Sequence, residues 1–119
     1  MVRRLLAAAL LMVPLGLPVQ AKMPLDEFKT RRANLRSSLD GVLVLFGHVE
    51  GRDEVFRVDE EPNFYYLTGW RQPGARLLLT PTRELLFLPH HNERVEHFQG
   101  RRSSAEDTDV HSATGFEEV

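Results

Sequence analysis

The sequence has 119 residues, of which 15 are Lys or Arg, 17 are Asp or Glu and none is Cys. This length suits one domain, and the lack of Cys excludes disulfides, so a packed core must hold the fold. The net charge of −2 gives no electrostatic reason to expect binding to nucleic acid or to anionic lipid.

Residues 1–21 have the layout of a secretory signal peptide. A basic start and an apolar run from Leu5 to Val13 precede small residues at Val19 and Ala21. The run is shorter than the ~20 apolar residues that a membrane span needs. We therefore expect export to the periplasm or beyond, cleavage after Ala21, and a mature domain of residues 22–119 that is not held in a membrane.

The stretch from Pro24 to Leu39 predicts a surface helix that ends at Asp40–Gly41. Its apolar side chains recur at roughly helical spacing: Leu25, Phe28, Ala33, Leu35 and Leu39. Most other positions are charged, among them Arg31, Arg32 and Arg36. We interpret these arginines as part of the solvent-facing side.

Three stretches predict strands. The run Val42–Phe46 is continuously apolar and rich in β-branched residues, which indicates a strand buried on both faces. Residues 76–80 and 84–88 are separated by the turn 81–83 and predict an antiparallel hairpin, which Pro89 ends. A short extended piece at 55–58 is a weaker prediction.

The aromatic stretch Asn63–Trp70 contains both tyrosines and the only tryptophan of the chain. It predicts one short helical turn with Asn63 as N-cap and Gly69 as its end. Phe64 and Leu67, three apart, should face the core together. We interpret the stretch as an aromatic part of the core.

After the hairpin the chain becomes polar. Residues 92–98 predict a short helix closed by Gly100, and Ser103 or Ser104 could cap a further helix that runs through Asp109. Residues 114–119 predict a turn and the start of a new element, so the domain looks incomplete at its C-terminus. Together the elements predict a small α/β domain with a mixed sheet flanked by helices.

Three of the histidines are candidates for metal ligands. His90, His91 and His97 lie close together, with Glu93 and Glu96 between them. The spacing His-Glu-x-x-His is absent, and His91 and His97 are six apart, which places them on different faces of a helix. A solvated strand end followed by a polar helix is the favoured interpretation.

The sequence also lacks the other common catalytic and phosphate-binding motifs. No Ser lies in a Gly-x-Ser-x-Gly elbow, and no glycine-rich loop follows a strand. The acids at 59–61 and 107–109 are interpreted as solvated, and His48 and His111 as isolated surface residues in loops. We therefore assign no catalytic, cofactor-binding or metal-ligating residue.

Several segments resemble the N-terminal domain of aminopeptidase P, the Xaa-Pro aminopeptidases. They are Phe56–Asp59, Asn63–Trp70, Pro73–Ala75 and the apolar strand segments at 77–79 and 85–88. The shared motif, read as structural, consists of Asn63, Phe64, Tyr65, Tyr66, Leu67, Thr68 and Gly69. The segment Glu96–Arg101 is similar to the family's Glu-x-Trp-x-Gly segment, with Phe98 in place of Trp.

The resemblance implies a two-domain enzyme whose second domain binds two divalent metals, usually manganese, and cleaves the peptide bond before proline. No position of this sequence matches those ligands, so the chain alone is expected to be inactive. In the family the N-terminal domain shapes the active-site cleft and takes part in subunit contacts. The resemblance makes Phe98 the candidate for such a contact.

The leading hypothesis is thus the exported, non-catalytic part of an Xaa-Pro aminopeptidase. Its expected partners are a catalytic domain of the same enzyme and further copies in a homo-oligomer, with peptide substrate bound only by the full-length form. A creatinase or prolidase, which share this architecture, would differ in substrate. A stand-alone exported binding module without peptidase activity is the alternative from another class.

Overall fold

The structure is a computed structural model that describes residues 22–48 and 61–119. Three short strands form its sheet: β1 (Leu43–Phe46), β2 (Arg76–Leu79) and β3 (Glu84–Phe87). They lie in the order β1-β2-β3, and both neighbouring pairs are antiparallel. The predicted signal peptide and the extended piece at 55–58 lie outside the described residues.

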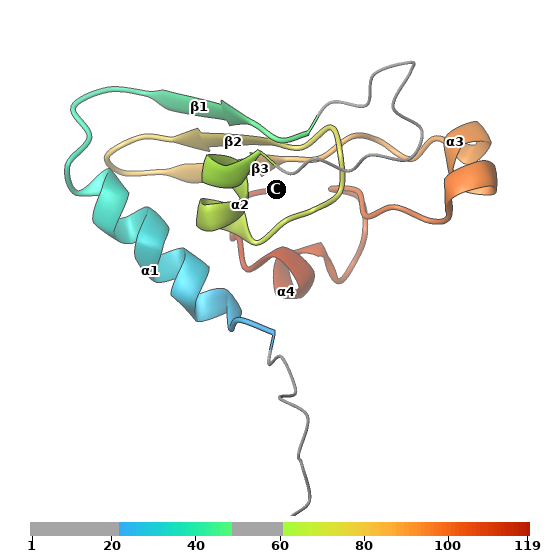
Figure 1. Ribbon diagram of the computed structural model, residues 1–119, viewed down its shortest axis with the longest axis horizontal. Helices are drawn as coiled ribbons and strands as arrows, with labels where there is room; N and C mark the ends of the chain where they lie inside the picture. The colour runs from blue at the N-terminus through green and yellow to red at the C-terminus, as the bar shows by residue number, and fades with distance from the viewer. Residues whose placement is uncertain (1–21, 49–60) are drawn as a thin grey trace, which may run out of the picture.

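Four helices accompany the sheet: α1 (Leu25–Arg36), α2 (Pro62–Thr68), α3 (Glu93–Gln99) and α4 (Val110–Thr114). In Figure 1, α1, α2 and α4 lie near one another beside the strands, while α3 stands beyond the strand ends, far from α1. Within the described part of the chain, no helix is long and apolar enough to cross a membrane. The predicted α/β class is confirmed, but the predicted mixed sheet is not found among the described residues, where both strand pairs are antiparallel.

The predicted hairpin is confirmed as β2 and β3, in which Leu77 lies opposite Leu86. The turn between the strands is held by Thr80, whose hydroxyl oxygen accepts the N–H of Arg83 at 2.8 Å. A side chain that completes the turn in this way stabilises a short connection without glycine.

Strand β1 differs from its prediction, because the described residues cover it on one face only. Leu43 and Leu45 point to the helices and are partly buried, whereas Val44 and Phe46 are 44% and 54% exposed. Side chains alternate along a strand, and the helices that pack on this sheet cover the face of Leu43 and Leu45. Within the described part of the chain, this continuous apolar run therefore forms the first strand of the order β1-β2-β3, with one face against the helices.

The N-cap of helix α2 lies two residues earlier than predicted. Its N-cap is Glu61, whose carboxylate accepts the N–H of Phe64 at 2.6 Å, and Asn63 lies exposed within the first turn. Pro62 suits the first helical position, so the cap falls on the residue before it. The predicted end is confirmed, since Gly69 has φ +64.

Gly69 also allows a close approach between α2 and α1. A Cβ atom at this position would lie 2.5 Å from a ring carbon of Phe28, which is buried in α1. Both the left-handed backbone and the ring of Phe28 therefore require glycine here.

The helix predicted from Ser103 or Ser104 starts later, at Val110. The residues before α4 form a turn in which the carboxylate of Asp107 accepts the N–H of Ser104 at 2.9 Å. An acid that folds back on the backbone in this way competes with a helix. After α4 the C-terminal residues return to the sheet, where the N–H of Leu86 donates to the carbonyl of Glu118 at 3.1 Å.

The core lies between the sheet and the three helices beside it. Its buried hydrophobic cluster consists of Phe64, Leu67, Ala75, Leu77, Leu79, Leu86 and Phe116. This confirms the prediction that Phe64 and Leu67 face inward from α2. Burial of these side chains is the main favourable contribution to folding, at about 25 cal/mol for each Å² of apolar surface.

Arg32 is buried in this core with an exposed fraction of 0%. Its assignment to the solvent-facing side of the helix is wrong, and Ala33, which the apolar spacing placed near the core, is exposed. Arg32 lies four residues after the buried Phe28, so the two share one helix face. The helix thus turns an arginine, not the alanine, toward the sheet.

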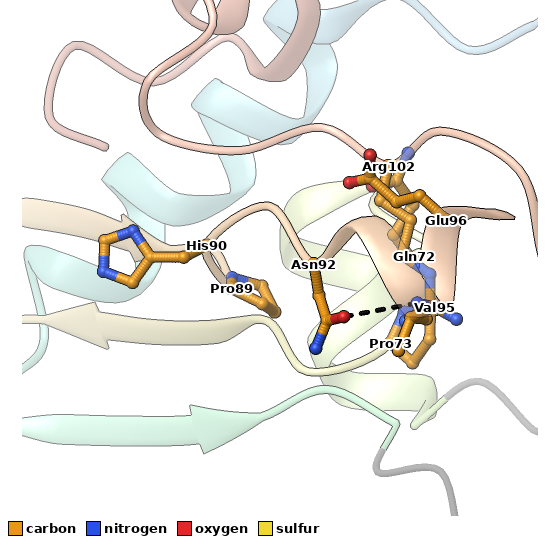
Figure 2. Close-up of a pocket in the computed structure, with 8 residues that line it drawn as sticks. All are labelled: Gln72, Pro73, Pro89, His90, Asn92, Val95, Glu96 and Arg102. Atoms are coloured by element: carbon orange, nitrogen blue, oxygen red, sulfur yellow. Dashed lines mark hydrogen bonds between the residues drawn. The ribbon is translucent and has the colours of Figure 1, made fainter.

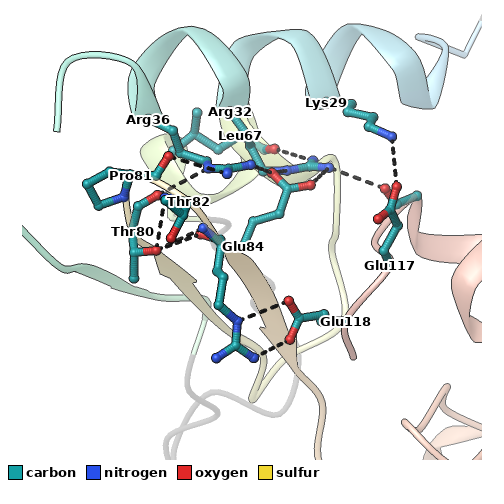
Figure 3. Close-up of polar contacts among 12 residues, drawn as sticks. Lys29, Arg32, Arg36, Leu67, Thr80, Pro81, Thr82, Glu84, Glu117 and Glu118 are labelled. Carbon is teal, nitrogen blue, oxygen red and sulfur yellow. Dashed lines mark hydrogen bonds and ion pairs between the residues drawn. The ribbon is translucent and has the colours of Figure 1, made fainter.

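Figure 3 shows how the buried guanidinium is satisfied. Its Nε and Nη2 atoms each donate to one carboxylate oxygen of Glu84 at 3.1 Å. Its Nη1 donates to the Leu67 carbonyl at 3.0 Å, and Nη2 also donates to the Gly115 carbonyl at 3.3 Å. The ring of Phe116 stacks on it, 3.7 Å from ring centroid to guanidinium carbon. One side chain therefore connects α1 to α2, to β3 and to the segment after α4.

Replacing Arg32 by Met should lower the free energy of unfolding by about 3 kcal/mol, because Glu84 would lose its bidentate partner in a buried position. Lys29→Met is the matched control on the same helix. It breaks only the exposed pair with Glu117 and should cost less than about 1 kcal/mol. Urea unfolding of both variants checks this, and similar losses in the two would contradict it.

Candidate functional site

Helix α3 carries Phe98, the residue that the resemblance marks as a contact. The predicted helix at residues 92–98 is confirmed with bounds Glu93–Gln99, because the side chain of Asn92 serves as its cap, and Gly100 follows its last turn. None of its residues is buried, and Phe98 is 81% exposed. The ring packs edge-on against His97, with centroids 5.1 Å apart. Exposed aromatic rings are a residue type that protein interfaces favour.

Three of the seven residues of the motif Asn63–Gly69 point into the core. Phe64, Leu67 and Thr68 are buried. The Thr68 hydroxyl donates to the Phe64 carbonyl at 2.8 Å and accepts the N–H of Trp70 at 3.0 Å, so it closes the end of α2. The motif brings no acid, base or nucleophile together.

Its two tyrosines and the following tryptophan have different surroundings. Tyr65 packs edge-on against Phe28, with centroids 6.2 Å apart, whereas Tyr66 is 56% exposed and lies under the guanidinium of Arg31 at 4.2 Å. Trp70 is partly buried, and its Nε1 atom has no partner among the described residues. Of the two tyrosines, Tyr66 is the one open to a further partner.

A charged cluster at the base of α3 was not predicted from the sequence. His91 Nδ1 lies 2.7 Å from Glu96 Oε1, and His91 Nε2 lies 3.0 Å from Asp107 Oδ1. A neutral imidazole has one N–H and one lone pair, so only the imidazolium can donate to both carboxylates. Arg101 also donates to Asp107 at 3.0 Å. The cluster fastens α3 to the turn that precedes α4.

The hydrogen bonds within this cluster shift the pKa values of its histidine and its two acids. Those to Glu96 and then to Asp107 raise the pKa of His91, and the bond from His91 lowers the pKa of Glu96. The backbone N–H of Ser104, followed by the ring of His91, lowers the pKa of Asp107 to about 2. At neutral pH both acids therefore favour the charged histidine between them.

The histidines considered as metal ligands do not converge. His91 faces the two carboxylates, His97 packs against Phe98, and His90 Nδ1 lies 2.7 Å from Glu106 Oε1. Across the described ranges, no three His, Asp or Glu side chains are placed to hold a metal ion. The metals that the resemblance implies for a catalytic domain thus find no fitting ligand set in this part of the molecule.

The remaining two histidines are less isolated than predicted. His111 is exposed, but it belongs to α4 and its Nδ1 lies 3.1 Å from the carbonyl of Phe116. His48 is partly buried after β1, and its Nε2 atom has no partner among the described residues. Its carbonyl accepts the N–H of Gly74 at 2.8 Å, which ties the end of β1 to the turn before β2.

A cavity of about 180 Å³ lies between α3 and the turn at residues 72–73 (Figure 2). Pro73, Pro89 and Val95 line it together with Glu96 and Arg102. It is smaller than the several hundred Å³ typical of small-molecule sites. Its lining also includes Gln72, His90 and Asn92 and carries no hydroxyl, thiol or amine group.

Stability should depend on pH through His91. The pKa of His91 is raised in the folded chain, so the charged ring stabilises the fold fully at pH values below its pKa in the unfolded chain, about 6.5. This stabilisation is lost as the pH rises through the pKa of His91 in the folded chain. Urea unfolding of the chain and of His91→Gln between pH 5 and pH 9 measures this, and the two curves should converge at high pH. His90→Gln, which alters only the exposed contact to Glu106, is the control. A pH-independent difference for His91→Gln would contradict the assignment.

Comparison with known proteins gives the same assignment as the motif. The family model for the aminopeptidase P, N-terminal domain, matches residues 28–119. The Xaa-Pro aminopeptidase of Haemophilus influenzae is 32% identical over 99 residues, which are 76% of this chain and 23% of that protein. Xaa-Pro aminopeptidase 3 of Dictyostelium discoideum is 32% identical over 102 residues, which are 77% of this chain and 20% of that protein. The chain thus spans less than a quarter of the length of these curated relatives.

Solved structures share the fold. Zinc-substituted E. coli aminopeptidase P in complex with product has a TM-score of 0.67 at 21% identity, over 82% of this chain and 24% of that chain. The structure of Pseudomonas aeruginosa aminopeptidase PepP has a TM-score of 0.65 at 24% identity, over the same shares. The family match extends from the buried face of α1 through α2 and α3 to the C-terminal residues. The chain therefore belongs to the family of aminopeptidase P N-terminal domains.

Proposed function

We propose that this chain serves as the non-catalytic N-terminal part of an Xaa-Pro aminopeptidase, where it shapes the mouth of the active-site cleft and takes part in subunit contacts. The carrying observation is the family match over residues 28–119 in a chain whose described residues show no catalytic or metal-binding set. A catalytic domain would supply the chemistry, including two divalent metals, in the family usually manganese.

Phe98 is the residue proposed to reach that cleft or a neighbouring subunit. Its ring is 81% exposed on a helix that stands beyond the strands (Figure 1). The contacts of His91 to Glu96 and Asp107 hold this helix to the body of the domain. A ring that is exposed but carried on a fastened helix is ready to bind without a large loss of conformational entropy.

A hybrid enzyme tests this proposal. Residues 22–119 replace the matching region of the Haemophilus influenzae Xaa-Pro aminopeptidase, and cleavage of an Xaa-Pro peptide is measured with manganese. The chain alone should be inactive and the hybrid active. Phe98→Ala in the hybrid should lower kcat/KM roughly tenfold, as truncation of an interface aromatic commonly costs more than 1 kcal/mol.

The control in the hybrid is Phe87→Ala, since Phe87 is an exposed phenylalanine that belongs to β3 and not to α3. Its kcat/KM should stay within a factor of about two of the hybrid's own. Cleavage by the isolated chain would overturn the non-catalytic role. If the two substitutions lowered kcat/KM equally, Phe98 would have no special role in a cleft or subunit contact.

Export through residues 1–21 is part of the same proposal, and its support is the basic start, apolar run and small residues of that segment. Expression of the full sequence in a bacterium with a periplasm should yield a chain that begins at Lys22. Intact-mass measurement of the periplasmic fraction checks this. A chain that keeps residues 1–21 and stays with the cytoplasmic fraction would contradict export.

A further inference from the structure

Helix α3 has little apolar contact with the rest of the described domain. None of its residues is buried, whereas α1 packs against α2, and α2 packs against β1. The cavity of about 180 Å³ beside α3 further reduces the packing on that side (Figure 2). Burial of apolar surface therefore contributes little to the position of this helix, and polar contacts must hold it in place.

A chain of hydrogen bonds through His91 supplies these polar contacts. His91 Nδ1 lies 2.7 Å from Oε1 of Glu96, which belongs to α3, and His91 Nε2 lies 3.0 Å from Oδ1 of Asp107. Asp107 in turn accepts the N–H of the buried Ser104 at 2.9 Å. The ring of His91 is thus the link between α3 and the buried part of the turn before α4.

The charge of His91 decides whether both bonds of this link exist. Only the imidazolium can donate from both nitrogens. After it loses a proton, one nitrogen presents a lone pair to a carboxylate oxygen, and the link is broken at that bond, whichever nitrogen it is. The side chains of His91, Glu96 and Asp107 are 28%, 19% and 12% exposed, so water replaces the lost bond less readily than it would at the surface.

The other charged groups at this place keep both acids ionised. Arg101 donates to Asp107 at 3.0 Å, and the backbone of Arg102 stabilises the carboxylate of Glu96. Arg101 follows the last turn of α3, so its contact fixes the segment after the helix and not the helix itself. The pKa of His91 is raised, chiefly by the hydrogen bond to Glu96, which agrees with a charged ring between two acids.

The same helix carries Phe98, two positions after Glu96, and the ring of Phe98 is 81% exposed. We propose that His91 is a positioning residue for Phe98. The protonated ring fastens α3 to the turn before α4, and loss of the proton releases the helix, so that Phe98 no longer keeps one position. The consequence for the enzyme rests on the contact role proposed for Phe98, whereas the fastening itself does not.

Time-resolved fluorescence anisotropy of the chain tests this fastening. Phe98→Trp places a reporter on α3, and Trp70→Phe removes the only tryptophan of the chain. The amplitude of local ring motion should rise at least about twofold between pH 5 and pH 9, as a fixed segment becomes flexible. The midpoint of this rise should coincide with the titration of the His91 ring, followed by NMR. The readout requires no catalytic domain.

Substitutions at His91 separate its charge from its mere presence. His91→Gln is neutral throughout and should give the large amplitude at every pH. His91→Arg keeps a cation with several donors and should keep the amplitude small up to pH 9. Urea unfolding at pH 5 checks that both variants are folded.

Two neighbouring histidines provide matched controls. His90 contacts Glu106, but these side chains are 86% and 60% exposed, and His97 is the titratable ring packed against Phe98. His90→Gln and His97→Gln should both keep the pH profile of the parent chain.

The hybrid enzyme shows whether the fastening reaches catalysis. The ratio of kcat/KM for the His91→Arg hybrid to that for the parent hybrid should rise with pH, up to the roughly tenfold effect expected for Phe98→Ala. In a Phe98→Ala background the ratio should not change with pH, because a positioning residue acts through the ring that it places. A flat ratio beside a pH-dependent anisotropy would leave the fastening in place and overturn the contact role of Phe98.

The positioning role of His91 would be overturned by ring motion that does not depend on pH in the parent chain. Small-amplitude motion in His91→Gln would equally contradict it, because other contacts would then hold α3. A pH profile that persists in His91→Arg, or one that disappears in His97→Gln, would assign the titration to a group other than His91.

Discussion

The pairing of Arg32 with Glu84 is the interaction on which the arrangement of the other elements depends. A buried charge is costly to remove from water, and the cost is offset only when its hydrogen-bonding groups are satisfied. Here the carboxylate is one partner, and the carbonyls of Leu67 and Gly115 are two more. Those carbonyls lie in the last turn of α2 and just after α4, where helices leave carbonyl groups without partners. One cation thus meets a strand carboxylate and the negative ends of two helices.

This arrangement explains how a small domain without disulfides joins segments that are far apart in sequence. The planar fork of a guanidinium reaches three acceptors in different directions, which the single ammonium group of lysine could not match. The ring of Phe116 covers the guanidinium and is itself part of the hydrophobic cluster. Docking of α1 therefore requires the hairpin, α2 and the C-terminal residues to be in place together. We expect these parts to fold as one cooperative unit.

Local chemistry predicted most elements but few of the contacts between them. The hairpin, the short helix closed by Gly100 and the end of α2 at Gly69 depend on neighbouring residues, and all three are confirmed. The burial of Arg32 could not be read from periodicity, which counts arginine as polar wherever it falls. Proline displaced the α2 cap from Asn63 to Glu61. His91 and Asp107 are 16 positions apart, so no local spacing could have joined them.

The contact between Gly69 and Phe28 links two positions that no motif connects. Since any side chain at Gly69 would enter the space of the Phe28 ring, the tolerance of one position depends on the identity of the other. A smaller residue at Phe28 would free that space, although the left-handed backbone would still disfavour most side chains. Surveys of double substitutions should therefore show positive epistasis between these sites. Their variation across homologues should be correlated, even though one belongs to the recognisable motif and the other does not.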